Sequence, residues 1–356
     1  MKEKKMKITK TTMPKSKPPV DKLGFGKYFT DHMLIMDFED GKWKEPEIVP
    51  YAPFAMDPST SILHYGQGIF EGLKAYKNKE GKITLFRALD NFKRMNNGCA
   101  RMCMPKLDID VVYNALVELI LLEKDWIPTD PGTSLYIRPT LIATDTQLGV
   151  SSGTKYRFFI ILSPVGSYYS TGLKPTKILI EDKYVRAPLG GTGEVKCMGN
   201  YAASLLSGDI AKKKGYSQVL WMDSNEHKYV EEVGAMNMFF VFDGVVKTPA
   251  LVGSILPGIT RDSVIKILKS ENIPIEETRI SIDDIKKGFE NGTLNEAFGT
   301  GTAAVVSPVG VLGFNGKDFE INSGKMGKIT EYLYDRLTGI QVGRYPDPFG
   351  WVIPIN

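Results

Sequence analysis

A glycine-rich stretch with a single lysine is the part of the sequence best suited to chemistry. Residues 190–199 contain four glycines and Lys196, and an apolar helical run follows directly. Glycine lets the backbone pass close to a bound group and adopt positive φ values. A lysine that is held away from bulk water on such a loop loses its preference for the charged form, which leaves a nucleophilic amine. The same residues would also fit an ordinary turn with a solvated lysine.

Two further stretches are suited to binding an anion. Residues 256–261 (Leu-Pro-Gly-Ile-Thr-Arg) open a predicted helix, and the free amides at a helix N-terminus attract phosphate. Residues 299–304 (Gly-Thr-Gly-Thr-Ala-Ala) form a second loop of small residues that is rich in donors. Neither stretch has P-loop spacing, and a dinucleotide fingerprint is absent. Each stretch alone could be a helix cap or a turn, but together with the lysine loop they predict a phosphorylated cofactor that is bonded by an amine.

Pyridoxal phosphate is the cofactor with these requirements. It needs a lysine that forms the Schiff base, a phosphate-binding site and a carboxylate that keeps the ring nitrogen protonated. Glu231 and Glu232 end a predicted strand at a turn, where an acidic side chain could face inward. A solvated acidic pair is the alternative interpretation.

A predicted strand over residues 134–140 adds two side chains with a chemical use. Alternation along a strand places Tyr136 and Arg138 on one face and Leu135 and Ile137 on the other. An arginine beside aromatic rings can bind a carboxylate in a forked geometry. A surface ion pair is the alternative for Arg138.

The elements that must position these residues indicate two α+β domains. A chain of 356 residues is too long for one small core, and its strands and helices come in unequal runs rather than in regular βαβ units. Ser281, followed by Asp284, predicts a capping box at a helix start. We predict a flexible basic leader, a smaller N-terminal domain, an interdomain loop in a stretch of turn formers, and a larger strand-rich domain that binds the cofactor, over residues 1–20, 21–165, 166–175 and 176–356 respectively.

Composition excludes several classes of function. The net charge is +4, and nothing beyond the basic leader resembles a nucleic-acid-binding module. No apolar run reaches the eighteen residues or so that are needed to span a membrane. Three cysteines cannot build a disulfide framework, and the three histidines lack the spacing of metal ligands. We therefore expect a soluble cytoplasmic protein without a metal site.

Several motifs in the same order resemble the branched-chain amino acid aminotransferases. The motifs are Glu-Val-Lys-x-x-Gly-Asn-Tyr, Glu-Val-Gly-x-Met-Asn, Leu-Pro-Gly and Phe-Gly-x-Gly-Thr-Ala, at residues 194–201, 232–237, 256–258 and 298–303. The resemblance extends from Phe25 to about Gln341 and is to the longer form that also occurs in animals. It implies a two-domain fold of fold-type IV with an α/β N-terminal domain, pyridoxal 5'-phosphate as cofactor, and a homodimer.

The resemblance also implies roles for the residues around the cofactor. Lys196 would bond the cofactor as a Schiff base and then move the proton at the substrate Cα. Glu232 would pair with the ring nitrogen, and Tyr201 would donate a hydrogen bond to the phenolic oxygen. Arg94 would bind the phosphate, together with the amides of Ile259, Thr260 and Thr302 and a hydroxyl of Thr260 or Thr302.

The substrates that the resemblance implies are L-leucine, L-isoleucine and L-valine, with 2-oxoglutarate as the amino acceptor. The matching substrate positions are Phe25, Tyr65, Tyr136, Arg138 and Tyr168. The amides of Thr302 and Ala303 would take the α-carboxylate. Arg138 could bind the side-chain carboxylate of glutamate, while aromatic rings cover an aliphatic side chain.

Two positions depart from the pattern of the animal enzymes. Those enzymes have a Cys-x-x-Cys pair directly after the Gly-Thr-Ala loop, whereas residues 304–307 here are Ala-Val-Val-Ser, so we predict no thiol switch. Ala235 stands where the animal enzymes have threonine, which removes a hydroxyl contact. A D-amino acid aminotransferase or an aminodeoxychorismate lyase of the same fold is one alternative, and a catalytically silent binding protein is another.

Overall fold

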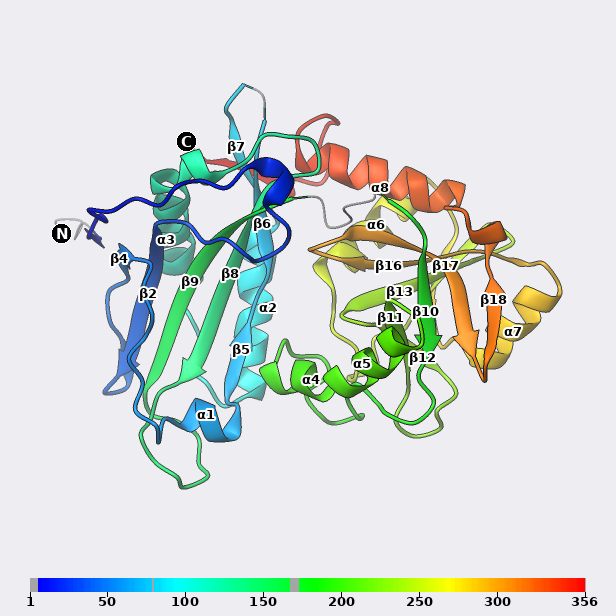
Figure 1. Ribbon diagram of the computed structural model, residues 1–356, viewed down its shortest axis with the longest axis horizontal. Helices are drawn as coiled ribbons and strands as arrows, with labels where there is room; N and C mark the ends of the chain where they lie inside the picture. The colour runs from blue at the N-terminus through cyan, green and yellow to red at the C-terminus, as the bar shows by residue number, and fades with distance from the viewer. Residues whose placement is uncertain (1–5, 79, 167–172, 356) are drawn as a thin grey trace. The chain divides into compact units, whose positions relative to one another are not determined.

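The computed structural model describes residues 6–78, 80–166 and 173–355, which form two compact units (Figure 1). Unit 1 comprises residues 1–170, 195–198 and 340–356, and unit 2 comprises residues 171–194 and 199–339. The predicted two-domain α+β class agrees with this division. The boundaries differ from the predicted ones, because the short segment around Lys196 and the C-terminal end both belong to unit 1.

Unit 1 is built on a ten-stranded, mostly antiparallel sheet. Eight strands follow the order β1, β4, β2, β9, β8, β6, β7, β19, while β3 pairs with β2 and β5 pairs with β8. The strands are β1 (Lys7–Ile8), β2 (His32–Glu39), β3 (Lys42–Trp43), β4 (Glu47–Pro50), β5 (Gly68–Phe70), β6 (Leu73–Lys77), β7 (Ile83–Phe86), β8 (Ser134–Ala143), β9 (Tyr156–Val165) and β19 (Val352–Ile355). The helices are η1 (Val20–Lys22), α1 (Ser61–Tyr65), α2 (Ala88–Arg101), α3 (Ile109–Leu122) and η2 (Lys124–Trp126).

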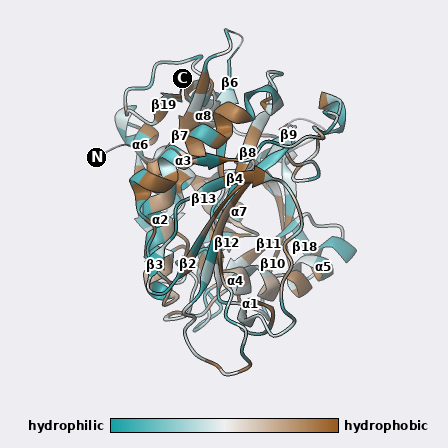
Figure 2. Ribbon diagram, turned by 90° about the vertical axis from the view of Figure 1, so that its left-hand side faces the viewer, coloured by the Kyte–Doolittle hydropathy of each residue, from teal (hydrophilic) through white to brown (hydrophobic). Residues whose placement is uncertain are grey.

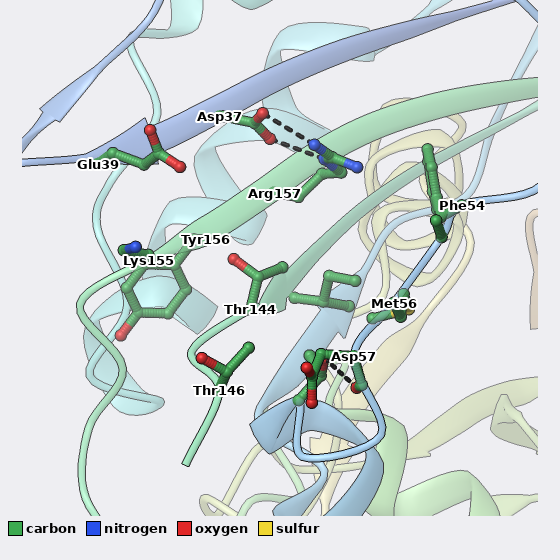
Figure 3. Close-up of a pocket in the computed structure, with 13 residues that line it drawn as sticks. Asp37, Glu39, Phe54, Met56, Asp57, Thr144, Thr146, Lys155, Tyr156 and Arg157 are labelled. Carbon is green, nitrogen blue, oxygen red and sulfur yellow. Dashed lines mark hydrogen bonds and ion pairs between the residues drawn. The ribbon is translucent and has the colours of Figure 1, made fainter.

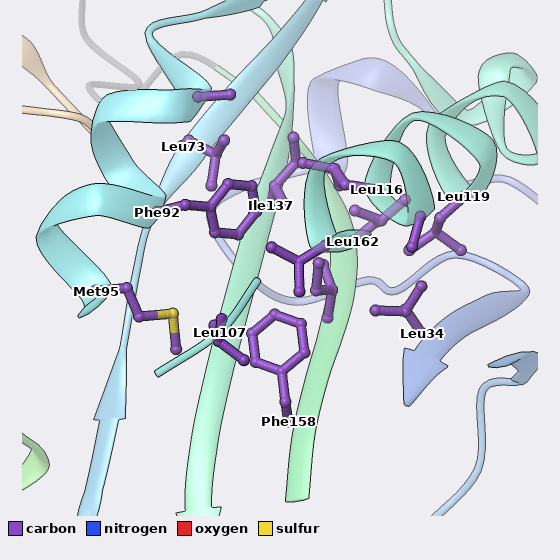
Figure 4. Close-up of a cluster of buried hydrophobic side chains, with 14 of the residues drawn as sticks. Leu34, Leu73, Phe92, Met95, Leu107, Leu116, Leu119, Ile137, Phe158 and Leu162 are labelled. Carbon is purple, nitrogen blue, oxygen red and sulfur yellow. The ribbon is translucent and has the colours of Figure 1, made fainter. Parts of the chain in front are cut away.

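The core of unit 1 lies between this sheet and helices α2 and α3 (Figure 4). Phe92 of α2 and Leu116 of α3 pack against Ile137 of β8 and Phe158 of β9, and all four are fully buried. Asp108 begins α3, since its carboxylate accepts hydrogen bonds from the amides of Asp110 and Val111. The helices therefore cover the face of β8 that carries Leu135 and Ile137, which leaves Tyr136 and Arg138 on the opposite face.

In the described part of the predicted flexible leader, residues 7–15 pack on unit 1. Lys7 and Ile8 pair in parallel with β4. The amide of Thr11 donates to Nε2 of His32 over 2.9 Å, and the ammonium group of Lys15 donates to the carbonyl of Thr30 over 2.8 Å. Composition alone does not predict this packing, because the partners of these residues come from other parts of the chain.

Unit 2 contains a nine-stranded sheet that closes on itself. The order is β12, β11, β10, β17, β16, β13, β14, β15, with β18 beside β17, and β12 also pairs with β13, so that six strands form a ring. The strands are β10 (Thr176–Ile180), β11 (Gln218–Met222), β12 (Val230–Val233), β13 (Met236–Phe242), β14 (Val245–Pro249), β15 (Ile275–Thr278), β16 (Leu294–Gly301), β17 (Val305–Phe314) and β18 (Lys317–Glu320). The helices are α4 (Met198–Ala203), α5 (Leu205–Lys213), α6 (Ile259–Ser270), α7 (Ile282–Glu290), η3 (Asn322–Gly324) and α8 (Lys328–Gln341), of which α4 and α8 each extend slightly into unit 1.

Unit 2 has its own apolar core, built from the ring strands and from α7. Phe240, Leu220 and Leu312 are fully buried there. The predicted capping box at Ser281 and Asp284 is present at the start of α7. Hydrophobic and hydrophilic residues alternate along the helices (Figure 2), as expected for elements with one buried face. None of the helices in the described ranges has the length and apolar character of a membrane-spanning segment.

Candidate active site

A short segment of unit 1 fixes the direction of the Lys196 side chain. The carbonyl of Lys196 accepts a hydrogen bond from the amide of Phe70 over 3.1 Å. The backbone of Cys197 forms an isolated antiparallel β-bridge with Ile69 of β5. Val195 and Cys197 are buried in the core of unit 1. Because neighbouring residues of extended chain point to opposite sides, Lys196 is directed away from that core.

Four of the predicted site residues meet around the ring of Phe70. The ammonium nitrogen of Lys196 lies 4.9 Å from the centre of that ring, and the guanidinium carbon of Arg138 lies 4.6 Å from it. Nη2 of Arg138 donates to the hydroxyl of Tyr136 over 3.1 Å. The Phe25 ring meets the Tyr136 ring edge to face, with 4.8 Å between centroids. We call these five residues the lysine cluster; they form an apolar and aromatic surface that contains two cationic groups.

Arg94 is held beside this cluster by a buried carboxylate. Nε and Nη2 of Arg94 each donate to Glu71 over 2.8 Å, and the side-chain amide of Asn91 donates to the same carboxylate over 2.9 Å. Burial alone would raise the pKa of Glu71, but Arg94, together with Lys196 and Asn91, holds that pKa below its ordinary value. Arg94 thus lies on α2 with a fixed orientation, which suits a residue that binds phosphate.

The environment of Lys196 brings the neutral amine within reach near neutral pH. Burial lowers its pKa to about 8, with Arg94 contributing in the same direction and Glu71 opposing it. Lys74 of β6 is a second buried lysine with this property, since burial lowers its pKa to about 8 as well. Lys74 stands opposite Tyr136 in the strand register and so shares its face of the sheet. Unit 1 therefore offers two lysines that could act as nucleophiles.

In unit 2, Glu232 and its neighbours hold one turn of the chain in place. Oε1 of Glu232 accepts a hydrogen bond from the amide of Leu256 over 2.7 Å, and the side chain of Asn237 donates to the carbonyl of Leu256 over 2.9 Å. Glu232 on β12 and Asn237 on β13 are partners in the strand register. A Cβ on Gly258 would lie 1.9 Å from Oδ1 of Asn237, so only glycine fits at that position.

This turn leads into the N-terminus of α6. Gly258 is the N-cap and supplies no side-chain acceptor, so the amides of the first turn, which include Ile259 and Thr260, point out of the helix end. Thr302 and Ala303 occupy the turn between β16 and β17. Thr300 is the register partner of Asn237, and its buried hydroxyl has no hydrogen-bond partner among the described residues.

Two further predicted positions lie on short helices. Tyr201 is on α4 of unit 2. Tyr65 is on α1 of unit 1, where the residue is 42% exposed and its hydroxyl donates to the carbonyl of Leu148. Tyr168 and most of the predicted interdomain loop fall outside the described residues.

A cavity of about 270 Å³ in unit 1 is lined by other residues (Figure 3). Asp37 and Arg157 face each other on its wall and form a two-pronged ion pair, with Nε–Oδ1 and Nη2–Oδ2 distances of 2.7 and 2.9 Å. Phe54, Met56 and Tyr156 also line it. None of the predicted site residues in the described ranges lines it.

Several residues that build the site were not predicted. Phe70 and Glu71 follow a glycine-spaced stretch, but nothing local to the sequence indicates that Glu71 would hold Arg94. Asn237 belongs to a motif that was recognised, although its bond to Leu256 depends on the strand register. Arg186 lies 3.3 Å from Glu232 and carries no sequence signal at all.

Comparisons with known proteins identify the family of the chain. The family model for amino-transferase class IV matches residues 68–311. Over 348 residues the chain is 53% identical to branched-chain-amino-acid transaminase 1 of Bacillus subtilis, covering 97% of this chain and 98% of that protein. The crystal structure of the Escherichia coli branched-chain amino acid aminotransferase superposes with a TM-score of 0.77 at 27% identity, covering 92% and 99% of the two chains. The branched-chain amino acid aminotransferase of T.th., solved with pyridoxamine 5'-phosphate, gives a TM-score of 0.75 at 27% identity, covering 90% and 98%.

Proposed function

The chain belongs to the amino-transferase class IV family, and from that premise we propose that it moves the amino group of L-leucine, L-isoleucine or L-valine to 2-oxoglutarate. The products are the branched-chain 2-oxo acids and L-glutamate. The observation that supports this most strongly is the identity of about one half, over nearly the whole chain, to a branched-chain-amino-acid transaminase. Pyridoxal 5'-phosphate is the cofactor of this family.

Each unit, taken by itself, carries groups of the kinds that pyridoxal phosphate requires. Unit 1 supplies a lysine with a lowered pKa and an arginine fixed by a buried carboxylate. Unit 2 supplies a buried carboxylate, a helix N-terminus whose first amides point outward, a glycine whose Cβ would clash, and the unpartnered hydroxyl of Thr300. When bound, the cofactor supplies an electron sink that stabilises negative charge at the substrate Cα.

Each group that binds the cofactor has a physical reason for its role. Nζ of Lys196 would bond the cofactor when neutral and would hold or move the proton at the substrate Cα, because its lowered pKa permits both states near neutral pH. Arg94 would hold the phosphate, and Glu232 would keep the ring nitrogen protonated. Tyr201 would donate to the phenolic oxygen. The amides of Ile259, Thr260 and Thr302 would complete the phosphate site.

The lysine cluster suits two kinds of substrate side chain. The rings of Phe25 and Tyr136 would cover an aliphatic side chain. The resemblance to the family assigns Tyr65 and Tyr168 to the same role. Arg138 binds the side-chain carboxylate of glutamate, and its buried Nε has no hydrogen-bond partner among the described residues, so it remains available as a donor. The amides of Thr302 and Ala303 take the α-carboxylate common to all the substrates.

We also propose that the protein is a cytoplasmic homodimer. Four large apolar or aromatic residues of unit 1 are exposed: Leu63, Tyr65, Leu148 and Val150. Exposed apolar residues of this kind favour contact with another chain. Cys99, Cys103 and Cys197 are free, which suits a reducing compartment.

Identifying the lysine that bonds the cofactor tests the proposal. The protein is loaded with pyridoxal phosphate, reduced with borohydride and mapped by mass spectrometry. We expect the label on Lys196 and not on Lys74, the other buried lysine. Lys196→Ala should lose glutamate formation from L-leucine and 2-oxoglutarate. A label on Lys74, or turnover that survives in Lys196→Ala, would contradict the assignment.

A further inference from the structure

Glu231 belongs to a buried network behind Glu232 that the proposed mechanism does not use. Nη2 of Arg186 donates to the carbonyls of Gly193 (2.8 Å) and Ser254, and lies 3.3 Å from Oε1 of Glu232. The hydroxyl of Ser254 donates to Oε1 of Glu231. A Cβ on Gly193 would lie 2.0 Å from the carbonyl oxygen of Ser254, so this packing leaves no space for a side chain. Ser254 thus connects Glu231 to the arginine that faces Glu232.

The charges in this network do not balance if both glutamates are ionised. Arg186 lies in ion-pair distance of Glu232, and its positive charge also acts on Glu231. Oε2 of Glu231 is buried and has no hydrogen-bond partner among the described residues. An ionised carboxylate with a bare buried oxygen is costly, so the protonated form of Glu231 is favoured.

Burial and the negatively charged groups near Glu231 also favour its protonated form. Burial raises the pKa of Glu231 to about 7, and Glu232 and Asp223 add to the rise through like charge. Ser254 and Arg186 oppose it. The carboxyl group therefore titrates in the range in which the enzyme would work.

We propose that Glu231 is a positioning residue whose proton decides how fully Arg186 neutralises Glu232. While Glu231 is protonated, the positive charge of Arg186 neutralises Glu232 alone. When the proton leaves, two carboxylates share one guanidinium, and the negative potential at Glu232 increases. This inference rests on the proposed role of Glu232 as the partner of the cofactor ring nitrogen. A protonated ring nitrogen is then held more tightly at pH 8 than at pH 6.

The test compares cofactor affinity across pH in matched variants. The dissociation constant of pyridoxal phosphate is measured from pH 6 to 8 for the wild type, for Glu231→Gln and for Glu226→Gln, an exposed glutamate on the neighbouring turn. We expect the ratio of the constants of wild type and Glu231→Gln to change about fivefold across this range, with a midpoint near 7. Glu226→Gln should follow the wild type. Ser254→Ala removes the bond that favours ionisation and should move the midpoint to higher pH.

A second readout needs no cofactor. A carboxyl group with a raised pKa binds an extra proton in the folded state, so the stability that it contributes is present below its ordinary pKa of 4.5 and is lost as pH rises through about 7. Urea unfolding of the apo-protein should show this loss in the wild type and not in Glu231→Gln. If Glu231→Gln keeps the wild-type pH dependence of cofactor binding, the inference is wrong while the proposed function stands. If no variant or wild type binds pyridoxal phosphate, the proposed function fails, and this inference fails with it.

Discussion

The ion pair between Glu71 and Arg94 should be a large local contribution to the stability of unit 1. Both side chains are nearly inaccessible, at 1% and 11% exposure, and two contacts of 2.8 Å join them. Glu71→Gln keeps the shape of the side chain but leaves the guanidinium buried without its counter-charge. Removal of one partner from a buried pair costs about 3–5 kcal/mol. Arg94→Gln leaves Glu71 without its counter-charge in the same way.

A double-mutant cycle measures this coupling. The free energy of unfolding of the apo-protein in urea is determined for the wild type, both single variants and the double variant. Since the double variant retains neither charge, we expect it to be more stable than the sum of the single effects predicts, by about 2 kcal/mol. Asp209→Asn removes an exposed ion pair with Lys213 and should change stability by less than about 0.5 kcal/mol. Additive effects of the two substitutions at Glu71 and Arg94 would refute the reasoning.

Three further predictions concern substrate choice, the turn at α6 and the reactive amine. In steady-state assays, Arg138→Gln should lower kcat/KM for L-glutamate by roughly 10- to 100-fold and change kcat/KM for L-leucine much less, because the charged hydrogen bonds are made only to the dicarboxylate. Equal losses for the two substrates would contradict this role of Arg138. Gly258→Ala forces a Cβ to within 1.9 Å of Asn237 and should lower the free energy of unfolding in urea by about 1–3 kcal/mol. Gly208→Ala, in open space on α5, should leave that free energy unchanged or raise it. Similar results for the two variants would contradict the predicted clash. Acetylation of Lys196 in the apo-protein, followed by mass spectrometry, should increase with pH and level off above about 8; a rate that still rises steeply far above that pH would argue against a lowered pKa.

Local patterns predicted the parts of the structure that depend on neighbours in the sequence. Alternation in β8 placed Tyr136 and Arg138 opposite Leu135 and Ile137, and the core contacts bear this out. The capping box of α7 needs only residues three positions apart. A two-domain α+β fold followed from the unequal runs of strands and helices.

The rest depends on contacts between distant residues, which periodicity does not reveal. Lys196 belongs to unit 1 because residues 195–198 pair with β5, more than a hundred positions earlier in the chain. The role of Glu71 can be recognised only in the folded structure, where α2 places Arg94 beside it. The network of Arg186, Ser254 and Glu231 likewise joins three separate segments of unit 2.

The central claim is that the protein exchanges amino groups with branched-chain L-amino acids through pyridoxal phosphate. The most direct measurement is the visible absorption spectrum of the purified protein loaded with this cofactor, recorded before and after addition of L-leucine and then of 2-oxoglutarate. We predict a band that falls with L-leucine and returns with 2-oxoglutarate. A band that ignores L-leucine and responds to D-alanine, or the absence of any band after incubation with the cofactor, would contradict the claim.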